Sequence, residues 1–259
     1  MFRRDPFGHL HFIKRLLVSS IGWLTRARYV RKNEIVISGT EHLEGLPGAN
    51  VLFVSNHQTY FAEVIAMLHI FSAVKKGYRN SIRRPWYLFR PRINNYFVAA
   101  TETMKKGLLP RIFAYVGSVS IERTWREGGK DVKRKVRMED LTNIGKALGD
   151  GWVINFPQGT TKVNAKGRRG ITLLVKKHQP VVIPVVVDGF RRAFDKKGLK
   201  LKKRGVKLYV RFKAPLELDT AESGDLMLEK IMDAIEQSER FRWNDKNETP
   251  AAKAPVSRQ

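Results

Sequence analysis

The chain has 259 residues, of which 49 are Lys or Arg and 24 are Asp or Glu, so its formal net charge is +25. A hydrophobic fraction of 42% supports a folded core, and the charge favours an anionic partner: nucleic acid, an anionic membrane or a phosphate-bearing substrate. The absence of cysteine excludes disulfides, thiolate metal sites and a cysteine nucleophile, and the six histidines show no metal-ligand spacing.

The first predicted element is a basic helix over residues 9–30. Its apolar residues recur at three- and four-residue intervals, and they are Leu10, Ile13, Leu16, Leu17, Ile21 and Leu24. The cations that flank or oppose this stripe are Lys14, Arg15, Arg26, Arg28, Arg31 and Lys32. Such a helix either lies in a membrane interface, with Trp23 and Tyr29 in the headgroup layer, or packs on the core of its own domain. The segment lacks the apolar region of a signal peptide, so we expect a cytoplasmic protein.

Strand and helix patterns alternate after this helix. The predicted strands are 34–38, 51–55, 96–100, 118–122, 152–155, 181–187 and 206–212. The predicted helices are about 61–73, 103–115, 131–148, 168–177 and 222–238. This alternation predicts an α/β fold with a mostly parallel central sheet flanked by helices. Pro184 interrupts one apolar strand, so we expect it at a bulge or at an edge of the sheet.

A loop over residues 77–92 interleaves basic and aromatic side chains. It holds Arg79, Arg83, Arg84, Arg90 and Arg92 with Tyr78, Trp86, Tyr87 and Phe89. This composition suits a membrane headgroup layer or a nucleic acid, but the aromatic rings could equally pack onto the core.

The first candidate for chemistry follows the apolar strand 51–55. Asn56 and His57 stand at its carboxyl end, where α/β folds place ligands. A histidine can deprotonate a hydroxyl near neutral pH, and Glu63, six residues further on, could orient the imidazole. The acceptor hydroxyl would then be the nucleophile.

Two further blocks follow predicted strands. Residues 117–123 read Gly-Ser-Val-Ser-Ile-Glu-Arg, and Arg123 offers a fork of N–H donors that suits phosphate. Residues 156–161 read Phe-Pro-Gln-Gly-Thr-Thr, a tight turn whose backbone N–H groups can face an anion.

In this order the blocks resemble the glycerolipid acyltransferases of the lysophosphatidic acid acyltransferase type. That family carries Asn-His followed by four residues and Asp, then Gly-x-x-x-Ile-x-Arg, then Phe-Pro-Glu-Gly-Thr, then an apolar strand with a proline. The counterparts here are Asn56-His57, 117–123, 156–160 and 181–187. Two positions depart from the pattern: Ala62 stands at the family's Asp position, with Glu63 next, and Gln158 replaces the family's Glu.

The resemblance implies transfer of a fatty acyl group from an acyl thioester, on coenzyme A or acyl carrier protein, to a lysophosphatidic-acid-like or other lipid acceptor. It implies His57 as the base and Glu63 as its orienting partner, and it needs no metal or bound cofactor. The residues expected to bind the acceptor are Asn56, Arg123, Gln158, Gly159 and Thr160. The resemblance also favours membrane docking by the N-terminal helix, hence a peripheral protein on the cytoplasmic face of an anionic membrane.

The expected organisation is a docking helix over residues 1–33, an acyltransferase domain over 34–243 and a disordered tail over 244–259. A catalytically inactive membrane-binding relative stays open as an alternative. A nucleic-acid-binding protein would explain the charge, but no zinc-finger, helix-turn-helix or RNP signature is present. A hydrolase would need a Gly-x-Ser-x-Gly elbow, and ATP chemistry would need a Walker loop; the sequence has neither.

Overall fold

The computed structural model describes residues 4–92, 94–101, 108–122, 126–127, 130–131 and 137–241. The strands are β1 (Glu34–Ser38), β2 (Val51–Ser55), β3 (Asn95–Ala100), β4 (Ser118–Ile121), β5 (Arg126–Glu127), β6 (Lys130–Asp131), β7 (Trp152–Asn155), β8 (Val181–Asp188) and β9 (Lys207–Phe212). The helices are α1 (His11–Val30), α2 (Ala62–Val74), α3 (Leu108–Val116), α4 (Met138–Asp150), α5 (Gly170–His178), α6 (Phe190–Ala193) and α7 (Gly224–Ala234). Short 3₁₀ helices are η1 (Thr40–Leu43), η2 (Pro85–Phe89) and η4 (Glu239–Phe241).

Within the described residues, seven strands form one sheet in the order β1-β9-β8-β2-β7-β3-β4. Its neighbouring strands run parallel, except that β8 and β9 are antiparallel. Strands β5 and β6 form a separate antiparallel pair. The predicted α/β fold with a mostly parallel central sheet is therefore confirmed.

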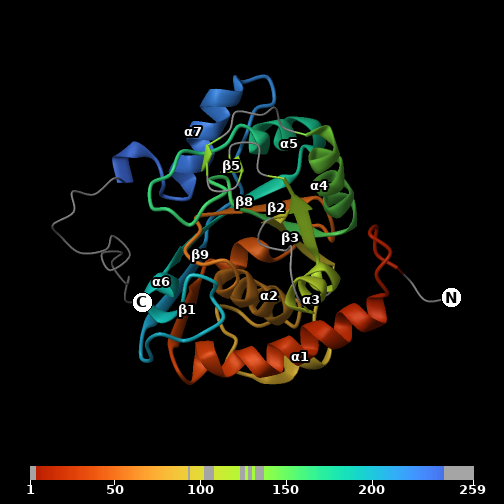
Figure 1. Cartoon of the computed structure of the whole chain (residues 1–259), viewed down its shortest axis with the longest axis vertical. Coiled ribbons are helices and arrows are strands. Elements are labelled where there is room, and N and C mark those ends of the chain that lie inside the picture. Colours follow the sequence, from red (N-terminus) through yellow and green to blue (C-terminus); the bar gives the residue numbers. More distant parts are fainter. Residues whose placement is uncertain are drawn as a thin grey trace.

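The central strand β2 is buried along its whole length, as its unbroken apolar sequence predicts. Val51 and Phe53 belong to a core that includes side chains of α1, α2 and α3. Leu52 and Val54 point to a second core, built with α4, α5 and α7. The two cores place these helix groups on opposite faces of the sheet (Figure 1).

Pro184 lies in β8, an interior strand, so the alternative of a sheet edge is wrong. The alternative of a bulge is confirmed by the pairing on the β9 side. Val185 pairs with Phe212, and Val182 pairs with Leu216. Residues 212–216 therefore contain one more residue between these two pairs than β8 does. The ring therefore occurs where the ladder is already interrupted, and the Pro184 carbonyl still accepts a hydrogen bond from the Lys213 N–H at 2.9 Å.

Helix α1 packs against α2, α3 and η2, and the predicted apolar stripe lies only partly on the packed side, where Leu17 and Ile21 contact the core. Leu16 and Leu24 of that stripe are exposed. The buried residues of α1 are Lys14, Val18, Gly22, Thr25 and Tyr29. Lys14, expected among the flanking cations, is buried beside Asp5 at 3.3 Å, with its Nζ 4.0 Å from the centre of the Tyr96 ring. A partner distant in sequence thus allows a cation to occupy the packed face.

A buried histidine joins α1 to α2. His69 Nε2 lies 3.0 Å from Thr25 Oγ1, and its Nδ1 lies 2.9 Å from the Tyr87 hydroxyl. Burial, with the nearby Arg26 charge, lowers the pKa of His69 to about 3, so the ring is neutral at ordinary pH. The Thr25 hydroxyl donates to the Ile21 carbonyl, so it accepts from His69 Nε2–H, and Nδ1 accepts from Tyr87.

None of the helices in the described part of the chain is long and apolar enough to cross a membrane. The predicted tail over 244–259 lies outside the described residues.

Candidate active site

The predicted site residues gather at the carboxyl edge of the parallel strands. His57 follows β2, and Phe156 follows the neighbouring strand β7. The two rings stack, with centroids 3.9 Å apart and planes inclined by 22°. Two loops from adjacent strands therefore meet at the imidazole.

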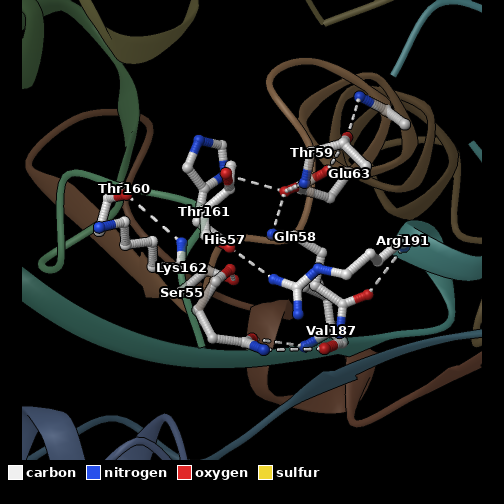
Figure 2. Close-up of polar contacts among 12 residues, drawn as sticks. Ser55, His57, Gln58, Thr59, Glu63, Thr160, Thr161, Lys162, Val187 and Arg191 are labelled. Atoms are coloured by element: carbon white, nitrogen blue, oxygen red, sulfur yellow. Dashed lines mark hydrogen bonds and ion pairs between the residues drawn. The ribbon is translucent and has the colours of Figure 1, made fainter. Parts of the chain in front are cut away.

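His57 and Glu63 form a hydrogen-bonded pair. The Glu63 carboxylate Oε1 lies 2.8 Å from His57 Nδ1 (Figure 2). Glu63 sits in the first turn of α2 and its side chain is inaccessible to solvent, whereas that of His57 is 13% exposed. The predicted contact is thus confirmed, and a hydrogen bond to a carboxylate places a proton on Nδ1, so that Nε2 is the acceptor nitrogen of the neutral tautomer.

The loop between the two residues supplies the remaining hydrogen bonds to the carboxylate. The backbone N–H groups of Gln58 and Thr59 donate to Oε1 at 2.7 and 2.8 Å, and the Thr59 hydroxyl donates to Oε2 at 2.5 Å. Burial alone raises the pKa of Glu63, but the hydrogen bond and charge of His57, with the hydrogen bonds from Thr59, hold the pKa below its ordinary value. A buried, ionised carboxylate therefore faces the imidazole.

Asn56 has a different place from the one predicted. Its amide nitrogen donates to the Val187 carbonyl at 2.9 Å, and its amide oxygen accepts from the Val187 N–H at 2.8 Å. Both ends of the amide are thus used by the backbone of β8, and the residue is only 7% exposed. Asn56 thus continues the β2–β8 pairing through its side chain and holds the backbone just before His57. Direct binding of the acceptor by the Asn56 amide is not supported.

The third block forms the predicted tight turn. The Gly159 N–H donates to the Phe156 carbonyl at 2.9 Å, and Gly159 has φ +62°, a conformation that glycine adopts without strain. Thr160 and Thr161 follow on the same loop, and neither donates its backbone N–H to an acceptor among the described residues. These two N–H groups are available to an anion, as the sequence predicts.

Gln158, which stands where the resembled family carries Glu, is buried and bonded within the chain. It is only 1% exposed, and its Nε2 donates to the Ala165 carbonyl at 2.9 Å and to Gln237 Oε1 at 3.1 Å. Both contacts of the Gln158 Nε2 group are therefore made within the chain, and they give no support to the prediction that Gln158 binds the acceptor. The buried amide instead ties the loop after the turn to the C-terminal side of α7.

Arg123 lies outside the described residues, so the structure places no phosphate-binding role there. Among the cations that follow the third block, Arg169 is paired with Asp225 at 2.6 Å on the α7 side. Lys162 is exposed on the loop that follows the turn.

Sequence reasoning missed Arg191. Its backbone N–H donates to Gln58 Oε1 at 3.2 Å, and its guanidinium donates to the Thr161 carbonyl at 2.5 Å (Figure 2). It therefore bridges the His57 loop and the Thr161 loop while staying exposed. A signal was present, because Arg191 follows the predicted strand 181–187 at the same carboxyl edge as His57. Thr59 was also missed; it stands before α2 and its hydroxyl accepts from the Ala62 N–H at 3.0 Å.

Among the described residues, no group of histidines and carboxylates could hold a metal ion. The arrangement instead offers a solvent-accessible base, a buried carboxylate behind it and free N–H donors on the next loop.

The chain was compared with known proteins by sequence and by structure. Neither a protein-family model nor a curated protein matches the sequence. The structure is similar to that of the 1-acyl-sn-glycerophosphate (LPA) acyltransferase PlsC from Thermotoga maritima, with a TM-score of 0.51 and 20% sequence identity. The match covers 89% of this chain and 81% of the other. At this identity the similarity establishes a shared fold.

Proposed function

We propose that this chain is an acyltransferase that moves a fatty acyl group from an acyl thioester to a hydroxyl of a lysophosphatidic-acid-like or related lipid acceptor. The observation that carries the proposal is the 2.8 Å contact between the buried Glu63 and Nδ1 of the accessible His57. The pair stands beside a loop with free N–H groups, in a fold shared with an LPA acyltransferase. This supports base catalysis without an enzyme nucleophile.

The proposed reaction starts with the acceptor hydroxyl at His57 Nε2. His57 removes the hydroxyl proton as the oxygen attacks the thioester carbonyl, and a C–O bond forms. The N–H groups of Thr160 and Thr161 would stabilise the negative oxygen of the tetrahedral intermediate. When the C–S bond breaks, His57 returns the proton to the leaving thiolate. Glu63 keeps the imidazole in the correct tautomer and stabilises its charged form.

The acceptor's anionic group would meet cations near the two loops. Arg191 and Lys162 are exposed there, and Arg123 is the third candidate by the family resemblance. A guanidinium suits a phosphate because several N–H donors lie in one plane. A lipidated amino acid would offer a carboxylate to the same cations, so the headgroup is a matter for assay.

The membrane contact in this proposal is made by an exposed apolar patch on α1 and η2. We call these residues the apolar patch: Phe12, Leu16, Trp23, Leu24, Trp86 and Phe89. The Trp23 and Phe89 rings lie 5.8 Å apart, so the two elements contribute to one surface. Exposed Arg15, Arg31 and Lys32 accompany it on or beside α1. Aromatic rings with nearby cations suit an anionic headgroup layer.

A panel of donors and acceptors tests the proposed function. Purified protein is incubated with acyl-coenzyme A or acyl-acyl carrier protein, and with lysophosphatidic acid or an N-acylated amino acid as acceptor; products are measured by mass spectrometry. We expect acylation of lysophosphatidic acid. If only the other acceptor reacts, the acyltransferase proposal stands and the glycerophospholipid assignment is wrong. If no pair reacts while the protein binds vesicles, the chain is an inactive membrane-binding relative.

A further inference from the structure

A turn far from His57 in sequence contacts the loop that carries the His57–Glu63 pair. Residues 195–200 connect α6 to the segment before β9, and they form a closed turn. Asp195 Oδ1 accepts the N–H groups of Leu199 and Lys200 at 2.8 and 3.0 Å, and the Asp195 N–H donates to the Lys200 carbonyl at 2.9 Å. The turn is therefore held in shape by its own first residue.

Two carbonyls of this turn accept the N–H groups of the catalytic loop. Tyr60 N–H donates to the Lys196 carbonyl at 3.0 Å, and Phe61 N–H donates to the Lys197 carbonyl at 3.1 Å. These N–H groups lie between His57 and Glu63 and immediately before α2, where a helix leaves its first N–H groups without internal partners. The turn therefore fixes the path of the chain that brings Glu63 to His57.

Gly198 lies directly against the groups that hold the Glu63 carboxylate. A Cβ atom at this position would lie 2.5 Å from the Ala62 nitrogen and 2.6 Å from Thr59 Oγ1. The same Thr59 oxygen donates to Glu63 Oε2 and accepts from the Ala62 N–H. No side chain can be added here without displacing the hydroxyl that holds Glu63.

We propose that the 195–200 turn is a positioning element of the His57–Glu63 pair, with Gly198 as its key residue. This inference rests on the proposed function, because it assigns the turn a role in the same acyl transfer. The turn touches neither donor nor acceptor in this proposal. It acts through the Thr59 hydroxyl and the N–H groups of Tyr60 and Phe61, so it should affect the chemical step rather than substrate binding.

The chain offers a matched control for this role. Gly205 also has a left-handed backbone, with φ +70° against +77° at Gly198, but nothing lies within 4 Å of a Cβ atom added there. Gly198→Ala and Gly205→Ala therefore introduce the same backbone strain. Only Gly198→Ala also introduces a collision at Thr59 and Ala62.

The test compares both variants with the natural protein in kcat, in KM for donor and acceptor, and in the downfield ¹H NMR signal of the His57 Nδ1 proton, assigned by its loss in His57→Ala. For Gly198→Ala we expect kcat to fall roughly 10- to 10²-fold with KM unchanged, and the signal to shift or vanish. Gly205→Ala should keep the kcat and the signal of the natural protein. Equal kcat and an equal signal in the two folded variants would overturn the proposal.

If Gly198→Ala does not fold, Asp195→Ala decides, because it loosens the turn without adding an atom beside Thr59. We expect a smaller loss of kcat and a broadened Nδ1 signal; unchanged kcat and signal in folded Asp195→Ala would overturn the proposal. The NMR signal also separates this inference from the proposed function. If the natural protein transfers no acyl group but Gly198→Ala still alters the signal, the positioning role holds and the proposed reaction fails.

Discussion

Glu63 contacts His57 at 2.8 Å although it stands one residue beyond the position at which the resembled family carries its aspartate. The longer side chain and the loop through Gln58 and Thr59 together place the carboxylate at Nδ1. We expect Glu63→Gln to keep the hydrogen-bonding shape but to lose the charge and the tautomer preference. Turnover should fall by roughly 10²- to 10⁴-fold with little change in KM. Steady-state kinetics on the folded variant checks this, and unchanged kcat would refute the orienting role.

The Thr59 hydroxyl makes the reaction's pH dependence testable. It is one of the groups that hold the Glu63 pKa below its ordinary value against the effect of burial. Thr59→Val removes this donor, so the Glu63 pKa should rise and the carboxylate should be protonated at a higher pH than in the natural protein. The acid limb of the kcat/KM profile should therefore move to higher pH. An acid limb at the same pH in both proteins would show that Glu63 ionisation does not control the rate.

The pH dependence of the free energy of unfolding should also change in Thr59→Val. A carboxyl group whose pKa is lowered by folding stabilises the protein above its unfolded-state pKa, and this contribution is lost as the pH falls through the folded pKa. Thr59→Val lacks the part of this contribution that the hydroxyl supplies, so its free energy of unfolding at neutral pH should be lower than that of the natural protein. Denaturant unfolding at neutral and at acidic pH should thus show a smaller difference between the two proteins at acidic pH.

Restoring the Glu of the resembled family at position 158 should harm this protein. Its amide donates to the Ala165 carbonyl and to Gln237 while fully enclosed. Gln158→Glu would place a carboxylate oxygen against the Ala165 carbonyl, so we expect a loss of about 1–3 kcal/mol in the free energy of unfolding and lower activity. Urea denaturation measures the loss in the free energy of unfolding. Gln237→Glu, which changes the side chain that accepts from Gln158 Nε2, is measured alongside. A more stable and more active Gln158→Glu protein would contradict this.

The apolar patch predicts a specific membrane defect. Replacing Trp23 and Phe89 by Ala should weaken sedimentation with anionic vesicles, because the two rings supply exposed aromatic area next to cations. Replacing Leu173 and Leu226 by Ala provides the control, since these exposed residues lie on α5 and α7, the helix layer across the sheet. High salt should also reduce binding of the natural protein. Equal binding by both double variants would exclude the patch as the docking surface.

Much of the fold follows from local patterns. Apolar runs such as that of β2 and the alternation of strands and helices identify the sheet, because buried parallel strands need continuous apolar sequence. The burial of Lys14 on the packed face of α1 could not be predicted in this way. Lys14 is buried because Asp5 and Tyr96 surround it, and Tyr96 belongs to a strand far along the chain.

The site, too, could be predicted only in part from the sequence. The His57–Glu63 contact depends on a short loop, so spacing alone indicates it. The amides of Asn56 and Gln158 were assigned to the acceptor, whereas in the structure they bind backbone groups of Val187 and Ala165. Polar side chains near a site satisfy the backbone as readily as a ligand, and only the tertiary structure distinguishes the two.

The most direct measurement is the rate of thiol release from an acyl thioester in the presence of acceptor, for the natural protein and for His57→Ala. General-base catalysis at Nε2 predicts a fall of at least ~10²-fold, with acceptor-dependent release in the natural protein and a His57→Ala protein that is still folded under the assay conditions. Acceptor-dependent release at the natural rate by folded His57→Ala would contradict the proposed mechanism.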